Sequence, residues 1–441
     1  MKSAAAVSII TISQLIHGVN CFSKLSAEDR LLSNIFEGYN SLIRPVHNAS
    51  SPPVVVYFSL ALVLLINVDE KNQIMQTNVW PTMKWNDYHM KWNPKEYDGI
   101  ETVRVPPDKV WLPDIVLFNN ADGNYLVSFY SNVVVEHTGD MLWVPPAVYK
   151  SSCLIDVEYF PFDEQVCSLT FGSWSFGNDE LQLSYLSGKR HAELNDYLPS
   201  GIWDLTDAPG LLSQSRSKIS YLIKIRRKSL FYTVILIMPT VLMAFLSMMV
   251  FYLPAESSEK ITLAISILLA LVVFLLVVSK ILPPTSSTIP LLAKYLLMTF
   301  IMNMVTIMVS VIIINVYFRG PATHIMQDWV KIVFLKYLPM LLIMQRPDGA
   351  QQELTRMKRE NREKRYLRSP FALLFKRGDR QREEWKFVSG VIDKLLLYIF
   401  FAVTTGGTLG ILLSAPNVFE QIDQTAVIEM LKKQAAEEML N

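Results

Sequence analysis

The chain has 441 residues, which is more than one ordinary domain holds and indicates two or three units. Hydrophobic residues make up 51% and charged residues only 18%, against roughly 25% charged in soluble domains, so a membrane protein is expected. The 41 Lys and Arg nearly balance the 40 Asp and Glu, which argues against a nucleic-acid-binding protein. Three cysteines, six scattered histidines and the lack of a catalytic triad or phosphate-binding glycine loop predict no metal site, no cofactor and no enzyme.

Residues 1–22 have the pattern of a secretory signal peptide. Lys2 precedes an apolar run from Ala4 to Ile16, which is too short to cross ~30 Å of hydrocarbon comfortably. A membrane anchor is the alternative. Export would make the sequon that begins at Asn48 available for glycosylation and would permit a disulfide.

Residues 23–228 are expected to form an extracellular all-β sandwich. Short strand-like runs such as Val54–Val68, Val133–Val135 and Gln182–Tyr185 are separated by clusters of Pro, Gly, Asn and Asp. Val54–Val68 is uninterrupted but too short for a span, so we interpret it as a buried strand. An amphipathic helix is predicted ahead of the strands, from apolar residues at helical spacing: Leu31, Leu32, Ile35, Tyr39 and Leu42.

Four uncharged segments of 18 to 24 residues follow, which is membrane-spanning length: Leu230–Leu253, Ile261–Val278, Tyr295–Val316 and Leu395–Leu413. They predict three spans in 229–318, a loop in 319–388, a fourth span in 389–414 and a tail in 415–441. The loop carries 16 Lys or Arg against 8 Asp or Glu between 319 and 387, so it is expected to be cytoplasmic, with the β domain and the tail outside. Within the loop we expect an amphipathic helix at the membrane interface around Trp329–Leu341 and a basic helix leading into the fourth span.

The second span carries a polar stripe along one helical face. Its members recur at spacings of three and four residues: Glu259, Thr262, Ser266, Leu269, Val273, Leu276 and Lys280. A packed bundle helix whose hydroxyls bond their own backbone is one interpretation. Polar groups inside a span are costly without function, so we favour a pore lining shared by several copies around an axis. In such an assembly, the copies of Leu269 and Val273 would form hydrophobic rings around the axis, which exclude water and ions when the pore is narrow. The copies of Glu259 would form a ring that attracts cations.

Cys153 and Cys167 are separated by thirteen residues, with Phe160-Pro161-Phe162-Asp163 between them. In an exported domain the pair is expected to be oxidised, and two free buried thiols are the alternative. The loop is too short to be the disulfide of an immunoglobulin sandwich. Its aromatic tip is expected to meet the membrane domain, where Pro283 ends the second span.

These features together resemble the pentameric Cys-loop ligand-gated channels. The resemblance rests on the cysteine spacing around FPFD, four spans after a β domain, and the run EKITLAISILLALVVFLLVVSKILPPTSS. Further stretches resemble the nicotinic acetylcholine receptor branch: VDEKNQ, TNVW followed by WNDY, WLPDIVLFNNADG, FGSWSFG and SAPN. The similarity extends from about Leu31 to Phe419.

The resemblance implies acetylcholine binding between neighbouring subunits, in an aromatic box that holds the quaternary ammonium. On the principal face Trp174 matches the family, but Phe118 and Phe176 lack hydroxyls, and the third loop lacks adjacent cysteines and flanking tyrosines. The chain therefore resembles a non-α subunit with a degenerate principal face. On the complementary face the matching residues are Trp80, Val134, Leu142 and Val144, and core packing is the alternative for either tryptophan.

The resemblance also implies how binding reaches the pore. Glu70 and Arg227 match the family's ion pair between the β domain and the first span, and Phe162 and Pro283 match its contact between the disulfide loop and the second span. Solvated surface charges are the alternative for the pair. Glu256 and Glu259 follow the family's cationic pattern, whereas Lys280 stands where many nicotinic subunits carry an acid.

We therefore predict a non-α subunit of a heteropentameric acetylcholine-gated cation channel, a multi-pass protein of the plasma membrane at the postsynaptic side. Its expected partners are α-type and other nicotinic subunits, acetylcholine at a shared interface, permeant cations and the lipid bilayer. A Cys-loop channel gated by a different small ligand is the alternative. A non-conducting adhesion receptor is a more distant one.

Overall fold

The computed structural model describes residues 26–48, 51–257, 259–284, 288–319, 326–344, 370–416 and 422–438. The predicted signal peptide, the sequon residues after Asn48 and much of the predicted cytoplasmic loop lie outside these residues. The chain forms two compact units. The first consists of the described parts of 1–155, 164–226 and 421–441, and the second of 156–163 and the described parts of 227–420.

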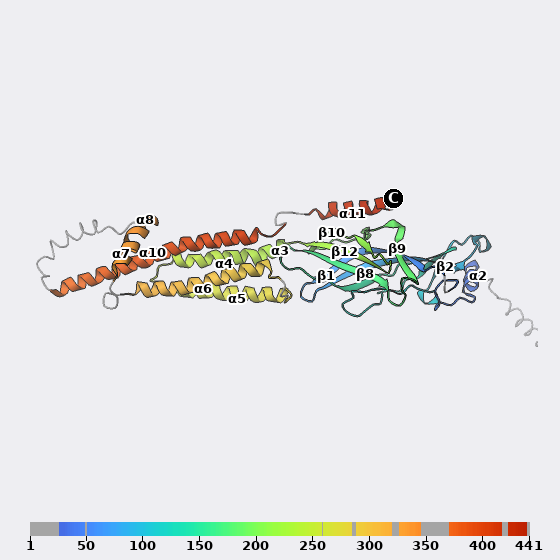
Figure 1. Ribbon diagram of the computed structural model, residues 1–441, viewed down its shortest axis with the longest axis horizontal. Helices are drawn as coiled ribbons and strands as arrows, with labels where there is room; N and C mark the ends of the chain where they lie inside the picture. The colour runs from blue at the N-terminus through green and yellow to red at the C-terminus, as the bar shows by residue number, and fades with distance from the viewer. Residues whose placement is uncertain are drawn as a thin grey trace, which may run out of the picture. The chain divides into compact units, whose positions relative to one another are not determined.

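The first unit is a sandwich of two sheets (Figure 1). The seven-stranded sheet has the order β3 (Thr102–Val105), β5 (Val133–Glu136), β6 (Thr138–Trp143), β2 (Ile74–Lys91), β1 (Val54–Asp69) and β9 (Leu181–Tyr185), and β7 (Ala147–Ser152) also pairs with β2. The five-stranded sheet has the order β10 (Trp203–Asp207), β12 (Lys218–Arg227), β8 (Glu164–Ser173) and β4 (Ile115–Leu117), and β11 (Gly210–Leu212) pairs with β12. Three short helical turns lie in the connections: η1 (Pro94–Glu96), η2 (Pro107–Lys109) and η3 (Leu186–Gly188).

The core of the sandwich follows from alternation along the strands. Side chains of β2 are buried at every second position over most of its length, so one face of the sheet packs inward and the other stays partly accessible. The two sheets meet through aromatic rings: Phe58 of β1 lies 5.0 Å from Phe171 of β8 and 6.2 Å from Tyr221 of β12. The predicted sandwich and the predicted strand at Val54–Val68 are confirmed.

The predicted N-terminal helix is shorter than its apolar spacing indicated. Helix α2 (Ala27–Phe36) begins with a capping box, in which Ser26 and Asp29 bond each other's backbone N–H. It ends before Gly38, whose φ of 77° is left-handed and does not continue a helix. Tyr39, predicted as part of the helix, instead donates from its hydroxyl to Asp87 at 2.9 Å.

A further helix, α11 (Gln424–Glu438), belongs to the first unit and was not predicted for the tail. Ile428 and Leu431 are its buried residues, and the helix lies beside β10 (Figure 1). Glu438 at its end accepts from the backbone N–H of Arg190 and contacts Nδ1 of His191, both at 2.8 Å. These contacts fasten the tail to the sandwich.

Among the residues that the structure describes, the second unit contains four helices long and apolar enough to cross a membrane, at Leu230–Tyr252, Glu259–Ile281, Leu291–Tyr317 and Arg382–Leu412. Each overlaps one predicted span, so the four predicted spans are confirmed. The first combines α3 (Leu230–Tyr232), η4 (Thr233–Ile237), α4 (Met238–Met249) and η5 (Val250–Tyr252); the others are α5 (Glu259–Ile281), α6 (Leu291–Tyr317) and part of α10 (Pro370–Leu412). Helices α4, α5, α6 and α10 lie side by side (Figure 1).

Two described segments of the second unit contain a π-helical turn. The segment η4 is π-helical and ends two residues before Pro239, which has no backbone N–H to donate, so the wider turn accommodates the proline ring. The segment predicted as an amphipathic helix forms α7 (Asp328–Ile332), the π-helical η6 (Val333–Tyr337) and α8 (Leu338–Leu341). Val330, Phe334 and Leu335 of this segment pack against the buried cluster of Met326, Trp385 and Val388, whereas Trp329, part of the predicted apolar face, is 59% exposed.

Candidate functional site

The four residues predicted for the complementary face come from three neighbouring segments of the seven-stranded sheet. Trp80 lies on β2, Val134 on β5, Leu142 on β6, and Val144 just beyond β6. All four are half-buried and alternate with fully buried neighbours, so they share the face of the sheet that points away from the sandwich core. The structure therefore brings the predicted residues to one accessible face.

The strand register adds charged residues to this face. Lys84 of β2 is opposite Leu142, Leu142 is opposite Val134, and Val134 is opposite the exposed Arg104 of β3. The ammonium of Lys84 pairs with Asp140 at 3.0 Å. Partial burial acts to raise the pKa of Asp140, but hydrogen bonds from Asn86 and Lys84 outweigh it and hold that pKa below its usual value. Arg104 was missed in the sequence because its place depends on register.

On the principal face, the structure brings Phe118 and Trp174 together and adds a third ring. The centroids of Phe118 and Trp174 are 5.9 Å apart, and Tyr125 lies 5.7 Å from Trp174. Asp114 fixes the Trp174 loop, since it accepts from the Ser173 hydroxyl at 2.5 Å and from the backbone N–H of Ser175 at 2.7 Å. Trp174 itself is 65% exposed, so its ring is available at the surface.

Phe176, grouped with these residues in the sequence, has different neighbours. Its ring lies 6.1 Å from Trp111, and the guanidinium of Arg44 lies 5.4 Å from its centroid. Arg44 is in turn held by Glu180 at 3.0 Å. Phe176 thus packs in a cluster of its own, beside an arginine.

Cys153 and Cys167 form the expected disulfide, which rules out two free thiols. The chain between them passes from the first unit into the second at Asp156 and returns at Glu164. In the second unit Asp163 binds the Arg227 guanidinium through two contacts, Nε at 2.7 Å and a terminal nitrogen at 3.1 Å. Both side chains are almost fully buried.

Aromatic rings complete the surroundings of this ion pair. The guanidinium of Arg227 lies 4.9 Å from the Phe160 ring and 5.3 Å from the Tyr232 ring, at cation–π distance. The loop tip also reaches the third span, because the N–H of Leu291 donates to the carbonyl of Glu158 at 2.8 Å. The sequence pointed to the run from Phe160 to Asp163, but it did not predict the contacts of Phe160 and Asp163 with Arg227, nor any role for Glu158. Their importance depends on the fold of the loop.

The other residues predicted to couple binding to the pore are placed individually. Phe162 is half-buried in the loop tip, and Pro283 is buried directly after α5. Glu70 follows the last residue of β1, Asp69, in the first unit. Their coupling role stays a prediction.

The stripe predicted to line a pore is the exposed face of α5. Leu269, Val273 and Leu276 are 67%, 53% and 58% exposed, and Glu259, Thr262, Ser266 and Lys280 are exposed as well. The opposite face is buried within the bundle through Ala264, Ile267, Leu271 and Val278. The Ser266 hydroxyl donates to the carbonyl of Leu263 at 2.8 Å, which leaves its oxygen free to accept from water.

At the start of α5 two adjacent charges point in opposite directions. Glu259 is exposed, whereas Lys260 is fully buried and binds Asp393 of α10 at 2.5 Å. Lys260 also donates to the carbonyl of Leu253 at 3.3 Å, so the helix is tied to both neighbours. A buried ion pair of this kind was not expected from the sequence.

Glu256, expected at the same end of the predicted pore, has partners of its own. Tyr317 donates to its carboxylate, and the ammonium of Lys386 lies 3.1 Å away. The Tyr317 hydrogen bond and Lys386 lower the pKa of Glu256 below its ordinary value. The charge of Glu256 is therefore partly compensated, whereas Glu259, three residues later, is exposed.

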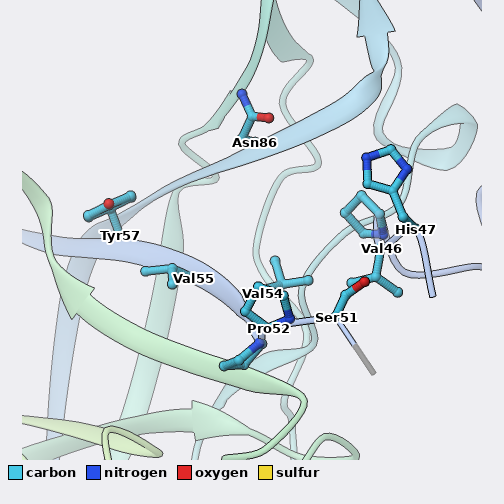
Figure 2. Close-up of a pocket in the computed structure, with 10 residues that line it drawn as sticks. Val46, His47, Ser51, Pro52, Val54, Val55, Tyr57 and Asn86 are labelled. Carbon is cyan, nitrogen blue, oxygen red and sulfur yellow. The ribbon is translucent and has the colours of Figure 1, made fainter. Parts of the chain in front are cut away.

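A cavity of about 340 Å³ in the first unit lies apart from the predicted ligand residues, none of which lines it. Figure 2 shows Tyr57 and Asn86, which come from β1 and β2, and His47 and Ser51, which come from the segment before β1. The His47 ring lies 3.7 Å from that of Tyr88. Among the described residues, no group of three or more His, Cys, Asp or Glu side chains is placed to hold a metal ion.

Comparison with protein families gives two adjoining matches that cover most of the chain. Residues 28–229 match the neurotransmitter-gated ion-channel ligand binding domain, and residues 236–377 match the neurotransmitter-gated ion-channel transmembrane region. A β sandwich with a short disulfide loop, joined to four helices of membrane-spanning length, is thus the architecture of a neurotransmitter-gated channel subunit. The chain belongs to the neurotransmitter-gated ion-channel family.

Its relatives narrow the branch to acetylcholine receptor subunits of the non-α kind. The chain is 75% identical to the acetylcholine receptor subunit beta-type acr-3 of Caenorhabditis elegans, over all of both chains. It is 52% identical to the beta-type subunit unc-29 of the same organism, over 94% of each chain. It is 46% identical to the acetylcholine receptor subunit beta-like 1 of Drosophila melanogaster, over 93% of this chain and 96% of the other. These relatives do not favour the alternative of a different gating ligand.

Proposed function

We propose that the chain is a non-α subunit of a heteropentameric acetylcholine-gated cation channel in the plasma membrane. Its partners are α-type and other nicotinic subunits, and its complementary face closes the agonist site of an α-type neighbour. The observation that carries this proposal is the common accessible face of Trp80, Val134 and Leu142 on the seven-stranded sheet. A half-buried tryptophan there offers a ring to the ammonium of acetylcholine.

The agonist role is tested by expressing the chain alone and together with an α-type subunit. We expect acetylcholine-evoked current only from the mixture, because the chain supplies only one competent face. Trp80→Ala removes a ring whose attraction for a desolvated cation is about 2 kcal/mol, so the half-maximal concentration should rise roughly 30-fold. Gln76→Ala, on the same face of the same strand, is the control and should shift it less than about twofold. Robust current from the chain alone, or no effect of Trp80→Ala, would contradict the proposal.

The pore role rests on the exposure pattern of α5. One subunit cannot enclose a pore, so five copies of this face are needed around an axis. Leu269, Val273 and Leu276 supply apolar rings that dewet when narrow, and Glu259 concentrates cations at the cytoplasmic mouth. Cysteines at Ser266 and Leu269 should react with charged thiol reagents from the water phase, whereas cysteines at the buried Ala264 and Leu271 should not. The reverse pattern would overturn the pore assignment.

Gating links the two units as a shift in populations. Agonist must bind the open form more tightly than the closed form, and the difference moves the equilibrium. We propose that Glu70, Phe162, Arg227 and Pro283 transmit the shift, since Arg227 and the disulfide loop lie where the chain passes between the units. Opening then withdraws Leu269 from the axis. Charge substitution at Glu70 should change the fraction of time open without changing the single-channel current.

A further inference from the structure

The aromatic cluster on the principal face contains a cation supplied by the chain itself. The Nζ of Lys218, the first residue of β12, lies 4.1 Å from the centroid of the Phe118 ring. This is well within the distance of about 6 Å at which an ammonium is attracted to an aromatic face. Phe118, Trp174 and Tyr125 are the rings of the cluster. An ammonium therefore already occupies it.

The strand register explains how the lysine reaches the ring. Lys218 on β12 and Val116 on β4 both lie opposite Gly172 of β8, one on each side. Phe118 and Trp174 follow two residues after Val116 and Gly172, so all of them point to the same face of the sheet. Gly172 has no side chain, and the lysine stem and the phenyl ring meet over it.

The fit over Gly172 is close. A Cβ atom at this position would lie 2.7 Å from Cε2 of Phe118 and 3.2 Å from Cγ of Lys218, so a side chain there would force both away. Within the part of the chain that the structure describes, Lys218 forms no ion pair with a carboxylate. The electrostatic partner of its ammonium is the Phe118 ring.

We propose that Lys218 is a specificity-determining residue, which excludes ammonium ligands from the principal face of this subunit by occupying the aromatic cluster in their place. The proposal rests on the function proposed above, because it explains which of the two faces takes the agonist. The bound lysine covers one face of Phe118, whose ring centroid is 5.9 Å from that of Trp174, and so adds a like charge to the cluster. At a separation of ~7 Å that charge alone weakens the binding of a cation roughly 3- to 50-fold, depending on the local dielectric.

The test uses surface-expressed receptors that contain an α-type partner and a reporter cysteine in place of one ring of the cluster, Tyr125→Cys, which leaves Phe118 and Trp174 to hold a cation. Labelling by a neutral thiol reagent is measured with and without tetramethylammonium, a bare quaternary cation. With Lys218 present, tetramethylammonium should leave the labelling rate unchanged. In Lys218→Gln it should slow labelling at least threefold, and a cationic reagent should gain roughly 3- to 50-fold in rate relative to the neutral one. Lys218→Arg keeps the charge and should behave as the parent.

Two results would overturn the proposal: equal protection with Lys218 and with Lys218→Gln, or Lys218→Arg behaving like Lys218→Gln. Adding Trp174→Ala to Lys218→Gln should abolish the protection, because the cation then loses its ring. Failure of the proposed function is distinguishable, since it would appear as absent acetylcholine current from receptors with native Tyr125. The labelling assay needs only surface pentamers.

Discussion

The buried pair of Asp163 and Arg227 allows a quantitative prediction. The two side chains are 2% and 0% exposed and share two contacts, at 2.7 and 3.1 Å. Asp163→Asn keeps the shape of the side chain but removes the carboxylate charge that binds the buried guanidinium at these two contacts. Breaking one partner of a buried ion pair costs about 3–5 kcal/mol. For a unit of this size each kcal/mol lowers the melting temperature by about 2–4 °C, so a loss of roughly 6–20 °C is expected.

The adjacent residues provide a matched control. Glu164 and Arg226 form the neighbouring ion pair, directly opposite each other on β8 and β12, but their side chains are 46% and 19% exposed. Exposed pairs contribute about 0–1 kcal/mol, so Glu164→Gln should lower the melting temperature by no more than about 4 °C. The measurement is the fraction of pentamer that survives heating, followed by fluorescence-detected size-exclusion chromatography.

A double variant separates the charge from the packing. Arg227→Gln combined with Asp163→Asn removes both charges, and replacing both members of a buried pair by neutral groups costs much less than neutralising one member alone. The double variant should therefore melt above either single variant, with a coupling energy of about 0.5–3 kcal/mol. If Asp163→Asn melts as Glu164→Gln does, or if the two single losses simply add, the pair does not stabilise the unit in this way.

Three further predictions concern conduction. Leu269→Ser makes the hydrophobic ring at this position easier to hydrate and so favours the open pore, and the half-maximal acetylcholine concentration should fall about tenfold. Leu271 is buried in the bundle, so Leu271→Ala should change folding or expression instead. Lys280→Glu should raise single-channel conductance by roughly 1.2- to 2-fold at low salt, and the gain should shrink in high salt because the Debye length falls from ~10 Å at 0.1 M to ~3 Å at 1 M. Lys386→Gln should raise the pKa of Glu256 towards its ordinary value, because it removes the nearby ammonium. On cytoplasmic acidification, the conductance of this variant should therefore begin to fall at a higher pH than that of the parent. Lys386→Arg keeps the positive charge and should match the parent. Inside-out patches at stepped pH measure this, and identical titrations would contradict it.

Local patterns were sufficient for much of the fold. The charge-free lengths predicted the four spans, and the spacing along α5 separated its exposed face from its buried one, because helical periodicity depends only on neighbouring positions. The strand that begins at Val54 was predicted because its apolar run is too short for a membrane span and lies between Pro53 and Asp69. The disulfide followed from export and a short loop. Each of these depends on residues close together in the sequence.

What the sequence did not reveal depends on contacts between distant residues. Lys218 meets Phe118 only because β12 and β4 pair with the same strand at Gly172. In the sequence Lys260 is simply another charged residue at the end of a span. Its buried partner, Asp393 of α10, is 133 positions away. The short extent of α2 was missed because one glycine conformation outweighed an apolar spacing that continued beyond it.

Helix α11 has a consequence for the order in which the protein is made. Its buried residues, Ile428 and Leu431, complete the sandwich, yet they are synthesised after all four spans. Domains usually fold as the ribosome releases them, from the N-terminus onward. Here the outer unit stays unfinished, with the side of β10 uncovered, until the last helix has entered the bilayer and its tail has been delivered across. The contacts of Ile428 and Leu431 are therefore the last of the sandwich to form.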